Sequence, residues 1–379
     1  MLEYTIYLAE GCNLKCTYCY EGIDKRSEKM DVPTMEQTLS FIFQNVLENE
    51  KIHIIFLGGE PLLNKSVFIH AVNWINIHHL KNKDRIMIEM TSNGILLDEE
   101  VMNIIDKESI NLSLSVDGTE QTQLKNRISV SGINTYGTIL SNMQKMIHKN
   151  IRFNVRMTVT SNNVQDMYYN VCYFLKMGVK RIYLAYDYFS NWDEEKLGIL
   201  DKQMESLDKL YIEKIAFSEE KIINLYDFKY TSFFMKRPIL FCSAGSISHL
   251  VVNTQGEIYP CGYVTNKKEW RIGDVWKGIE RKKFICEVKK HILDKSKCKN
   301  CEKAFACIST RCGFLNYKIT GILNKPSLNI CRLEQILFSH NIKVLKYLYK
   351  KKCPRLMEYI KIAKEYKLEP NECVKYMTE

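Results

Sequence analysis

The sequence predicts an α/β fold in which six strand–helix units form a partial barrel or an open sheet, followed by a cysteine-rich segment. Strand-like segments alternate with helix-like stretches through the first half of the chain. Eight of the fourteen cysteines fall between Cys242 and Cys331. A chain of 379 residues is too long for one ordinary core, so we expect two domains.

The predicted strands are rich in β-branched and aromatic residues. They cover residues 3–8, 52–57, 86–91, 110–116, 151–159 and 181–186. The helices between them carry apolar stripes that should cover a parallel sheet through right-handed crossovers. Two such stripes are Met35, Leu39, Ile42, Phe43, Val46 and Leu47, after Asp31 and Pro33, and Ile139, Leu140, Met143, Met146 and Ile147, in a helix near 136–149. Functional groups are expected at the carboxyl ends of the strands.

The alternation stops beyond residue 190. A polar helical stretch at 193–215 and an irregular bridge precede a predicted β-hairpin, in which HLVVN and EIYP flank a turn at 254–256. The cysteine-rich segment holds few periodic helices, so metal rather than burial should hold it together. The final segment should be helical, with apolar positions at Leu333, Ile336, Leu337, Ile342, Leu345 and Leu348. The expected domain limits are 1–215, 216–241 (a bridge), 242–331 and 332–379.

Cys12, Cys16 and Cys19 follow the first predicted strand with the spacing C-x3-C-x2-C. The chain shows no signal peptide and no long apolar span, so we expect a cytoplasmic protein without membrane contact. In that reducing compartment clustered cysteines indicate metal ligands rather than disulfides. Three thiolates can fill three sites of a four-iron, four-sulfur cluster and leave one iron open. Zinc would need further ligands, and no histidine lies near this loop.

The formal net charge of +10 does not by itself indicate a nucleic-acid partner. Lysine and arginine are scattered, and the only dense run is KYLYKKKCPR at 346–355. A solvated helix face is the favoured interpretation of that run. As a hypothesis, the lysines at 350–352 bind an acidic peptide, and such binding should weaken with salt.

The cysteine spacing, with Tyr18 before the third cysteine, resembles the radical S-adenosylmethionine (SAM) enzymes, and the resemblance implies a partial (β/α)6 TIM-like barrel. GGEP (58–61) looks like the family segment whose backbone meets the SAM amino group. TSNG (91–94) and SLSVDGTE (113–120) close the next two strands; ordinary loop capping is the alternative for each. Arg127, with Arg156 as a second candidate, would pair with the SAM carboxylate. Many relatives carry a His-Asp pair where this chain has Gln123 and Leu124. The implied SAM contacts are Tyr18, Gly58, Gly59, Glu60, Thr91, Asn93, Ser115, Asp117, Arg127 and Arg156.

The later cysteines resemble the SPASM extension of radical SAM enzymes that modify peptides, a domain that binds auxiliary iron–sulfur clusters. The resemblance implies one auxiliary cluster, expected to be [4Fe-4S], on Cys298, Cys301, Cys307 and Cys331. A second would rest on Cys242, Cys261 and Cys312. The loop CISTRC has four intervening residues where the family usually has three. Cys286 either completes the second cluster or is a half-buried structural residue, the favoured interpretation. Cys172 should be a core residue, and Cys353 and Cys373 should not be ligands.

The resemblance implies an oxidoreductase that cleaves SAM reductively to a 5′-deoxyadenosyl radical. The leading prediction is a maturase that forms thioether cross-links from cysteine sulfur to carbon in a ribosomally made peptide. The rival is an anaerobic sulfatase maturase; those enzymes carry an aspartate directly after the cysteine that corresponds to Cys261, whereas this chain has Gly262. A lesser alternative is a zinc protein that binds nucleic acid through CKNC (298–301). Asp187 is a weak candidate for a catalytic base, and a loop aspartate is favoured.

The expected partners follow from the same resemblance. They are a cysteine-containing precursor peptide and an electron donor such as flavodoxin or ferredoxin. Many thioether maturases begin with a peptide-recognition module, whereas eleven residues precede Cys12 here. Recognition of the leader is therefore assigned to another part of the chain or to a separate protein. No nucleic acid is expected, and His78 and His79 are assigned no role.

Overall fold

The computed structural model describes residues 2–23, 25–47, 49–234, 249–293 and 297–365. The chain divides into two compact units, each assembled from separate stretches of sequence. The first comprises Met1–Val116, Gln123–Asn154 and Ser243–Ile292, and the second comprises Asp117–Thr122, Val155–Cys242 and Leu293–Glu379. Within the described ranges, every helix is too short or too polar to span a lipid bilayer.

Parallel strands form the centre of the first unit. They are β1 (Leu2–Ala9), β3 (Ile52–Gly58), β4 (Ile86–Ser92) and β5 (Asn111–Ser115), hydrogen-bonded in that order. These are the first four predicted strands, so the prediction is confirmed. Nearly every residue of β1 is buried, as expected for a parallel strand covered on both faces. The carboxyl ends of these strands therefore open at one edge of the sheet.

The helices of the first unit are α1 (Val32–Gln44), α2 (Lys65–His79), α3 (Glu99–Lys107), α5 (Tyr136–His148) and α9 (Arg281–Lys290). The Asp31 side chain caps α1 by accepting a hydrogen bond from the Thr34 amide. The predicted stripe of α1 is buried at Met35, Leu39 and Ile42. The buried stripe ends earlier than expected. Leu47 lies beyond the last turn of α1 and is 72% exposed.

The predicted hairpin is present and lies beside β1. Its strands are β10 (His249–Val252) and β11 (Glu257–Tyr259), extended by β12 (Gly273–Asp274) and β13 (Gly278–Ile279). β10 pairs with β1 in parallel, and the remaining pairs are antiparallel. Part of the cysteine-rich segment thus continues the sheet of the first unit. The domain limits expected from the sequence stay a prediction.

A separate two-stranded ribbon lies close to the first cysteines. It consists of β2 (Leu14–Cys16) and β6 (Arg127–Ser129), which run antiparallel. The cross-strand pairs are Leu14 with Ser129, Lys15 with Ile128 and Cys16 with Arg127. α4 (Glu120–Asn126) leads directly into β6, and the boundary between the two units falls inside this helix.

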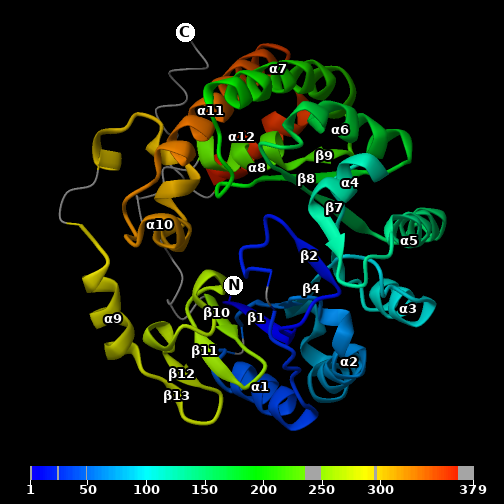
Figure 1. Ribbon diagram of the computed structural model, residues 1–379, viewed down its shortest axis with the longest axis vertical. Helices are drawn as coiled ribbons and strands as arrows, with labels where there is room; N and C mark the ends of the chain where they lie inside the picture. Colours follow the sequence, from blue (N-terminus) through cyan, green and yellow to red (C-terminus); the bar gives the residue numbers. More distant parts are fainter. Residues whose placement is uncertain (1, 24, 48, 235–248, 294–296, 366–379) are drawn as a thin grey trace. The chain divides into compact units, whose positions relative to one another are not determined.

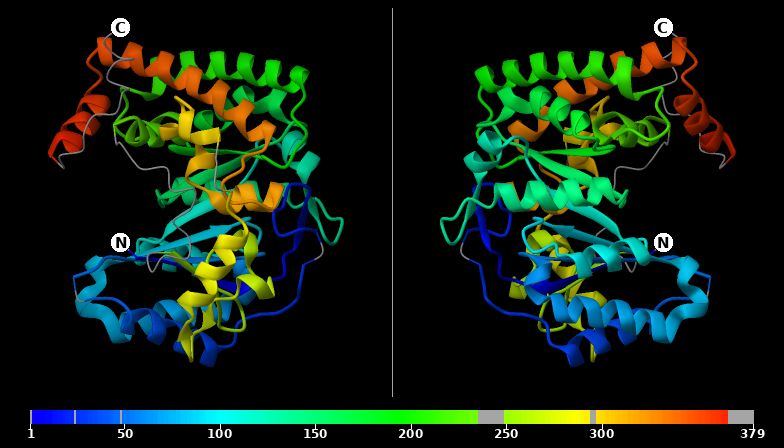
Figure 2. Two further views of the ribbon diagram at one scale, coloured as in Figure 1. Left: turned by 90° about the vertical axis from the view of Figure 1, so that its left-hand side faces the viewer. Right: turned by 90° about the vertical axis from the view of Figure 1, so that its right-hand side faces the viewer.

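The second unit contains β7 (Phe153–Val159), β8 (Arg181–Tyr186) and β9 (Ile222–Ile223), which pair in parallel through residues 155–159 of β7. Its helices are α6 (Met167–Lys176), α7 (Glu194–Leu210) with a π-helical end at Tyr211–Ile215, α8 (Asn224–Phe234), α10 (Gly313–Thr320), α11 (Leu328–Lys350) and α12 (Pro354–Glu365). α7 and α11 run side by side (Figure 2). The prediction of a helical C-terminal segment is confirmed over residues 332–365.

One expectation for the second unit is wrong. Residues 224–234 were expected to lie in an irregular bridge, but they form α8. The buried Asp227 carboxylate accepts hydrogen bonds from the Ile223 amide at 2.9 Å and the Tyr211 hydroxyl at 2.8 Å, and it pairs with Arg355 at 2.7 Å. These tertiary contacts stabilise a helix that has almost no amphipathic pattern of its own.

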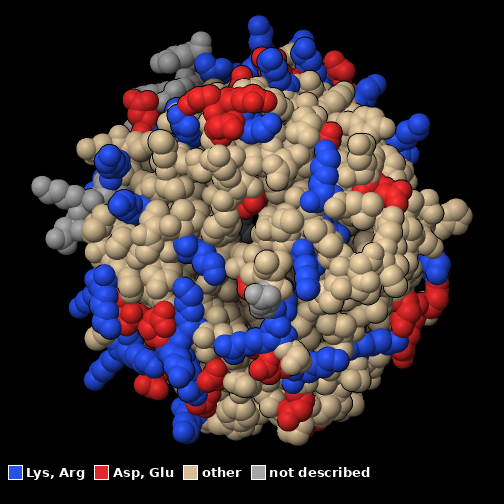
Figure 3. Space-filling model, in the orientation of Figure 1, with Lys and Arg blue, Asp and Glu red and all other residues tan. Residues whose placement is uncertain are grey.

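The basic side chains are distributed as the sequence suggested. Figure 3 shows Lys and Arg at many places on the visible face, with Asp and Glu among them. The lysines at 350–352 are exposed at the end of α11, as expected of a solvated helix face.

Candidate functional site

The three N-terminal cysteines lie on one loop of the first unit, after the carboxyl end of β1. Cys16 is the last residue of β2, and pairing with β6 holds it in place. The Cys19 amide donates to the Cys16 carbonyl at 3.1 Å, and the Gly22 amide donates to the Cys19 carbonyl at 2.9 Å. The loop is therefore closed by its own turns and anchored by a strand pair.

Two glycines at the end of β3 let its backbone touch the base of this loop. The Gly59 amide donates to the Ala9 carbonyl at 2.9 Å, and the Glu60 amide donates to the Gly11 carbonyl at 2.8 Å. A Cβ atom at position 59 would lie 2.2 Å from the Gly11 oxygen, and one at Gly58 would lie 2.1 Å from the Ala9 oxygen. Only glycine fits at such an approach, which is the physical reason for GGE at this point.

Glu60 joins two of the predicted cofactor segments. Its buried carboxylate accepts hydrogen bonds from the Ser92 hydroxyl at 2.9 Å, the Asn93 amide at 2.8 Å and the Leu62 amide at 3.2 Å. Burial raises the pKa of Glu60 to about 7, although these donors oppose the shift. The Asn93 side chain in turn lies 2.7 Å from Asn13 Oδ1 and 3.8 Å from Cys12 Sγ. Glu60 and Asn93 thus lie beside the cysteine loop.

Two cations lie next to the sulfur atoms. Lys25 Nζ is 2.9 Å from Cys19 Sγ, and a guanidinium nitrogen of Arg127 is 3.9 Å from Cys16 Sγ. The Arg127 guanidinium also lies over the Tyr18 ring, 5.4 Å from its centroid. Burial raises the pKa of Cys12 to about 11. Neighbouring cations stabilise thiolates, so this loop fits an iron–sulfur cluster held through three thiolates.

The other predicted SAM contacts are placed differently. Thr91 and Ser115 are half-buried at the ends of β4 and β5 in the first unit. Asp117 and Arg156 belong to the second unit, where Asp117 Oδ1 accepts a hydrogen bond from the Thr158 amide at 3.0 Å and Arg156 is exposed. The Asp187 carboxylate accepts hydrogen bonds from the Phe189 amide and the Ser190 hydroxyl. Asp187 therefore caps its own loop, as favoured from the sequence.

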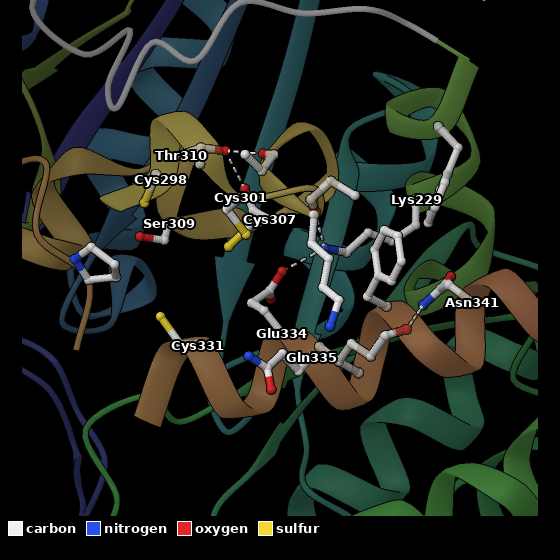
Figure 4. Close-up of a pocket in the computed structure, with 17 residues that line it drawn as sticks. Lys229, Cys298, Cys301, Cys307, Ser309, Thr310, Cys331, Glu334, Gln335 and Asn341 are labelled. Atoms are coloured by element: carbon white, nitrogen blue, oxygen red, sulfur yellow. Dashed lines mark hydrogen bonds and ion pairs between the residues drawn. The ribbon is translucent and has the colours of Figure 1, made fainter. Parts of the chain in front are cut away.

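A second cysteine centre lies in the second unit. Cys298, Cys301, Cys307 and Cys331 line one cavity of about 80 Å³. In Figure 4 their sulfur atoms point into the space between the segment at 298–310 and α11. This is the same set of four that the sequence resemblance assigned to one auxiliary cluster.

The electrostatics of this cavity suit a metal cluster. Burial, with the nearby Glu334 carboxylate, raises the pKa of Cys307 to about 12. Burial also raises the pKa of the Cys331 thiol, and its neighbours Cys298 and Cys301 add to that effect. Thiols packed this closely do not readily ionise together, because their negative charges would repel one another. A bound cationic metal centre would stabilise the thiolates. The four residues therefore fit an auxiliary iron–sulfur cluster.

The remaining cysteines are not gathered in one unit. Cys261 belongs to the first unit and Cys312 to the second, while Cys242 lies outside the described residues. Cys286 is exposed on α9, so the expectation that it is half-buried is wrong: the polar helix KKFICEVKK buries only Glu287. Cys353 is buried, with its thiol 3.3 Å from the Ala216 carbonyl, and Cys172 is partly buried in α6; Cys373 lies outside the described residues.

The described geometry differs from that of a mononuclear zinc site. Over the part of the chain that the structure describes, no three His, Cys, Asp or Glu side chains converge closely enough to hold a single ion. A structural zinc site needs four ligands about one ion, whereas a four-iron cluster binds each thiolate through a different iron and holds them further apart.

Four functional neighbours were not predicted from the sequence. Lys25 contacts Cys19, and Glu334 and Lys229 border the second cysteine centre. Tyr7, in β1, lies beside Gly262. Glu334 has a detectable sequence signal, because it follows Cys331 by three residues and so faces the same side of a helix. Lys25 lies six residues after Cys19 on the same loop, whereas Lys229 and Tyr7 are remote in sequence from the residues that they contact.

Comparison with known proteins agrees with this geometry. Residues 6–169 match the radical SAM superfamily. A cysteine-type anaerobic sulfatase-maturating enzyme of Clostridium perfringens is 25% identical over 298 residues, which cover 70% of this chain and 75% of that protein.

Two solved structures share the fold. Native anSMEcpe with bound AdoMet and Cp18Cys peptide superposes with a TM-score of 0.74 at 19% identity, covering 96% of this chain and 99% of that one. Streptococcus suis SuiB bound to precursor peptide SuiA superposes with a TM-score of 0.62 at 15% identity, covering 87% of this chain and 75% of that one. The expected α/β fold is confirmed by these likenesses.

Proposed function

The chain carries a radical SAM domain, and on that premise we propose that it joins a cysteine sulfur to a carbon atom of a ribosomally made peptide. A radical SAM enzyme that matures a peptide or protein is the broader conclusion. The thioether cross-link is the specific proposal. Likeness to two solved structures with bound peptides supports a peptide substrate.

The residues of the first unit would hold the cofactors. Cys12, Cys16 and Cys19 would ligate a [4Fe-4S] cluster, and the backbone at 58–60, with Asn93 and Arg127, would receive SAM. Bound there, the cluster and SAM supply a carbon radical able to abstract hydrogen from an unactivated C–H bond. The chain itself contributes orientation: Glu60 fixes the GGEP and TSNG segments, and Arg127 lies beside Cys16 and Tyr18.

The four cysteines in the second unit would hold an auxiliary cluster that accepts an electron. A thioether bond forms when one C–H and one S–H hydrogen are lost, so two electrons must leave the substrate. SAM held in the first unit would supply an acceptor for the C–H hydrogen atom, an auxiliary cluster held by these four cysteines would supply an acceptor for the second electron, and the thiol proton would pass to solvent. The further cluster that the sequence resemblance assigned to Cys242, Cys261 and Cys312 stays a prediction.

The observation that favours the thioether reaction is the environment of Gly262. Sulfatase maturases resemble this chain but carry an aspartate at that position. Here a Cβ atom at 262 would lie 2.9 Å from the hydroxyl of Tyr7, which is only 1% exposed. The Tyr7 hydroxyl also lies 3.4 Å from that of Tyr20. An aspartate at 262 would therefore press on the Tyr7 hydroxyl, which would have to shift to admit it.

Formylglycine formation is the second candidate, because the C. perfringens relative is a sulfatase-maturating enzyme. The two reactions leave different products. A thioether product has lost two hydrogens per cross-link and no longer reacts with an alkylating agent at that cysteine. A formylglycine product has exchanged sulfur for a carbonyl oxygen and reacts with hydrazines.

The test is anaerobic incubation of reconstituted, reduced enzyme with SAM and either of two peptides, followed by mass spectrometry. One peptide is the cysteine-rich product of a neighbouring reading frame, and the other is a sulfatase segment. The proposal expects 5′-deoxyadenosine with both cofactors present and a cross-link only in the first peptide. It fails if Cys16→Ala forms as much 5′-deoxyadenosine as the unaltered enzyme. An aldehyde in the sulfatase peptide would establish the second candidate.

The proposed partners are those expected from the sequence. An acidic electron donor such as flavodoxin or ferredoxin would supply the electron that starts each turnover. A separate leader-recognition protein, or the lysines at 350–352, would bind the peptide leader. We propose that the enzyme works in the cytoplasm.

A further inference from the structure

The ribbon of β2 and β6 has two faces with opposite character. Side chains of paired residues point to the same side of a strand pair, and successive pairs alternate. Cys16 and Arg127 form one pair, and Arg127 is only 7% exposed. The next pair, Lys15 and Ile128, points the other way; Lys15 is exposed and Ile128 is 49% exposed.

The exposed face continues beyond the last named pair. Val130, two residues after Ile128, is 52% exposed, and its amide donates to the Asn13 carbonyl at 3.0 Å, which extends the ladder. Thr17 is exposed on the opposite strand. We call Lys15, Thr17, Ile128 and Val130 the ribbon face. Its two large aliphatic side chains, Ile128 and Val130, lie two residues apart on one strand.

The ribbon segments themselves carry positive charge only, and the acidic residues Glu10, Glu21 and Glu120 directly flank them. Residues 11–20 and 121–135, which include both strands and their flanks, contain no aspartate or glutamate. They contain Lys15, Lys125 and Arg127, and the first two are exposed. A surface that combines these aliphatic side chains with Lys15 and Lys125 is complementary to a protein whose contact surface is acidic.

We propose that the ribbon face is the docking surface for an acidic one-electron carrier protein of the flavodoxin or ferredoxin kind, an inference that rests on the proposed function. Cys16, a proposed cluster ligand, is covalently adjacent to Lys15 and lies on the opposite side of the same strand. A carrier bound there is separated from the cysteine loop by little more than the thickness of one strand.

Distance and charge both favour this surface. Electron transfer slows steeply with the distance between donor and acceptor, so a carrier gains most by binding where the acceptor lies nearest to the exterior. In the transfer the carrier is oxidised by one electron and the cluster is reduced by one; no bond forms or breaks. Redox partners form small, transient interfaces. The exposed Lys15 and Lys125 would steer an acidic partner toward the ribbon face at low salt.

The test separates docking from chemistry by changing the reductant. Reconstituted enzyme is reduced anaerobically in a stopped-flow instrument, once with photoreduced flavodoxin and once with dithionite, and 5′-deoxyadenosine is measured with each. The variants are Lys15→Glu and Ile128→Ser. The matched controls in the same unit are Lys107→Glu, at an exposed lysine of α3, and Ile77→Ser, at a 77% exposed isoleucine of α2.

We expect Lys15→Glu to lower the second-order rate with flavodoxin by about tenfold at low salt, with the difference vanishing at high salt. Ile128→Ser should lower it at both salt concentrations. Dithionite-driven reduction and 5′-deoxyadenosine formation should match the unaltered enzyme, as should both controls throughout. Iron content shows whether each variant still holds its clusters.

Four results would overturn the proposal. The first is an unaltered rate of electron transfer from flavodoxin in both variants, and the second is an equal loss of dithionite-driven activity, which would mean damage to the Cys16 strand. The third is weaker peptide binding, which would assign the face to substrate, and the fourth is a changed sedimentation coefficient, which would assign it to a second copy of the chain. If the unaltered enzyme formed no 5′-deoxyadenosine with dithionite, the proposed function would fail, independently of the docking result.

Discussion

The Nζ atom of Lys229 lies 3.1 Å from Oε2 of Glu334 at the edge of the cavity lined by Cys298, Cys301, Cys307 and Cys331. The same carboxylate oxygen accepts a hydrogen bond from the Ile308 amide at 3.0 Å, and Lys229 also donates to the Ala306 carbonyl at 2.8 Å. This ion pair between α8 and α11 therefore holds the backbone on both sides of Cys307.

Removal of the Glu334 carboxylate should loosen this centre. In Glu334→Ala the Lys229 cation loses its carboxylate, and the Ile308 amide and the Tyr188 hydroxyl lose their acceptor, so we expect the free energy of unfolding to fall by ~3 kcal/mol. We also expect less bound iron when Glu334→Ala is added to a chain that carries alanine at positions 12, 16 and 19. Those three alanines remove the N-terminal cysteines, so the remaining iron reports the later cysteines. Glu334→Gln keeps an acceptor for the Ile308 amide and should lose less. Iron and sulfide assays with urea unfolding measure both effects; Ser339→Ala, an exposed change on α11, is the control. Unchanged iron binding by Glu334→Ala would contradict the assignment.

Glu60→Gln should disturb the SAM segment without removing any side-chain volume. The carboxylate accepts from two backbone amides and one hydroxyl, and an amide group would present N–H to at least one of these donors. The resulting unsatisfied donor should cost about 1–3 kcal/mol of stability and weaken SAM binding. Equilibrium dialysis of SAM and thermal unfolding would show this, with the exposed Glu28→Gln as the matched change. Wild-type SAM affinity in Glu60→Gln would show that Glu60 does not organise the site.

Gly262→Asp should not convert the enzyme into a sulfatase maturase. The new Cβ would press on the Tyr7 hydroxyl, and overpacking of this kind costs about 1–3 kcal/mol. Combining it with Tyr7→Phe removes the hydroxyl and should restore part of the lost stability, which thermal unfolding can measure. Gly198→Asp, at a helix position with open space around the Cβ, is the control. Formylglycine production by Gly262→Asp alone would refute the steric argument.

The pH dependence of stability should report a charged row across four strands of the first unit. Burial opposes protonation of His53, but ion pairs with Glu3 at 3.3 Å and Glu89 at 3.2 Å outweigh it and raise the pKa of His53 to about 9. Contacts with His249 and His53 lower the pKa of Glu3 to about 2.

The two pKa shifts affect stability at opposite ends of the pH range. The stabilisation from His53 is complete below its unfolded pKa of 6.5 and is lost as pH rises through about 9. That from Glu3 is present above 4.5 and is lost as pH falls through about 2. The thermal midpoints of the unaltered chain and of His53→Gln should therefore differ most between pH 4.5 and 6.5 and converge above pH 9. If the difference between the two thermal midpoints grew above pH 9, the assigned role of His53 would be wrong.

Local sequence was sufficient for the elements whose pattern and environment agree. All six predicted strands are present, because runs such as IHIIFL are buried on both faces and need no distant contact to be recognised. The cysteine spacings were equally informative, since the number and order of thiols are properties of the chain itself. Residues 224–234 were missed because α8 depends on Arg355 and Tyr211, which are remote in sequence.

The sequence alone determined the α/β scaffold, through the alternation of strand-like and helix-like segments, and it supplied the cysteine spacings from which we propose iron–sulfur clusters. Only the tertiary structure decided which charged groups lie beside the cysteines. Lys229 and Glu334 are 105 residues apart, and Arg127 lies 111 residues from Cys16, so no local pattern links them. Ion pairs and hydrogen bonds act over a few ångströms of space and are indifferent to separation along the chain, which is why folding must bring these partners together before the chemistry of the sulfur atoms is set.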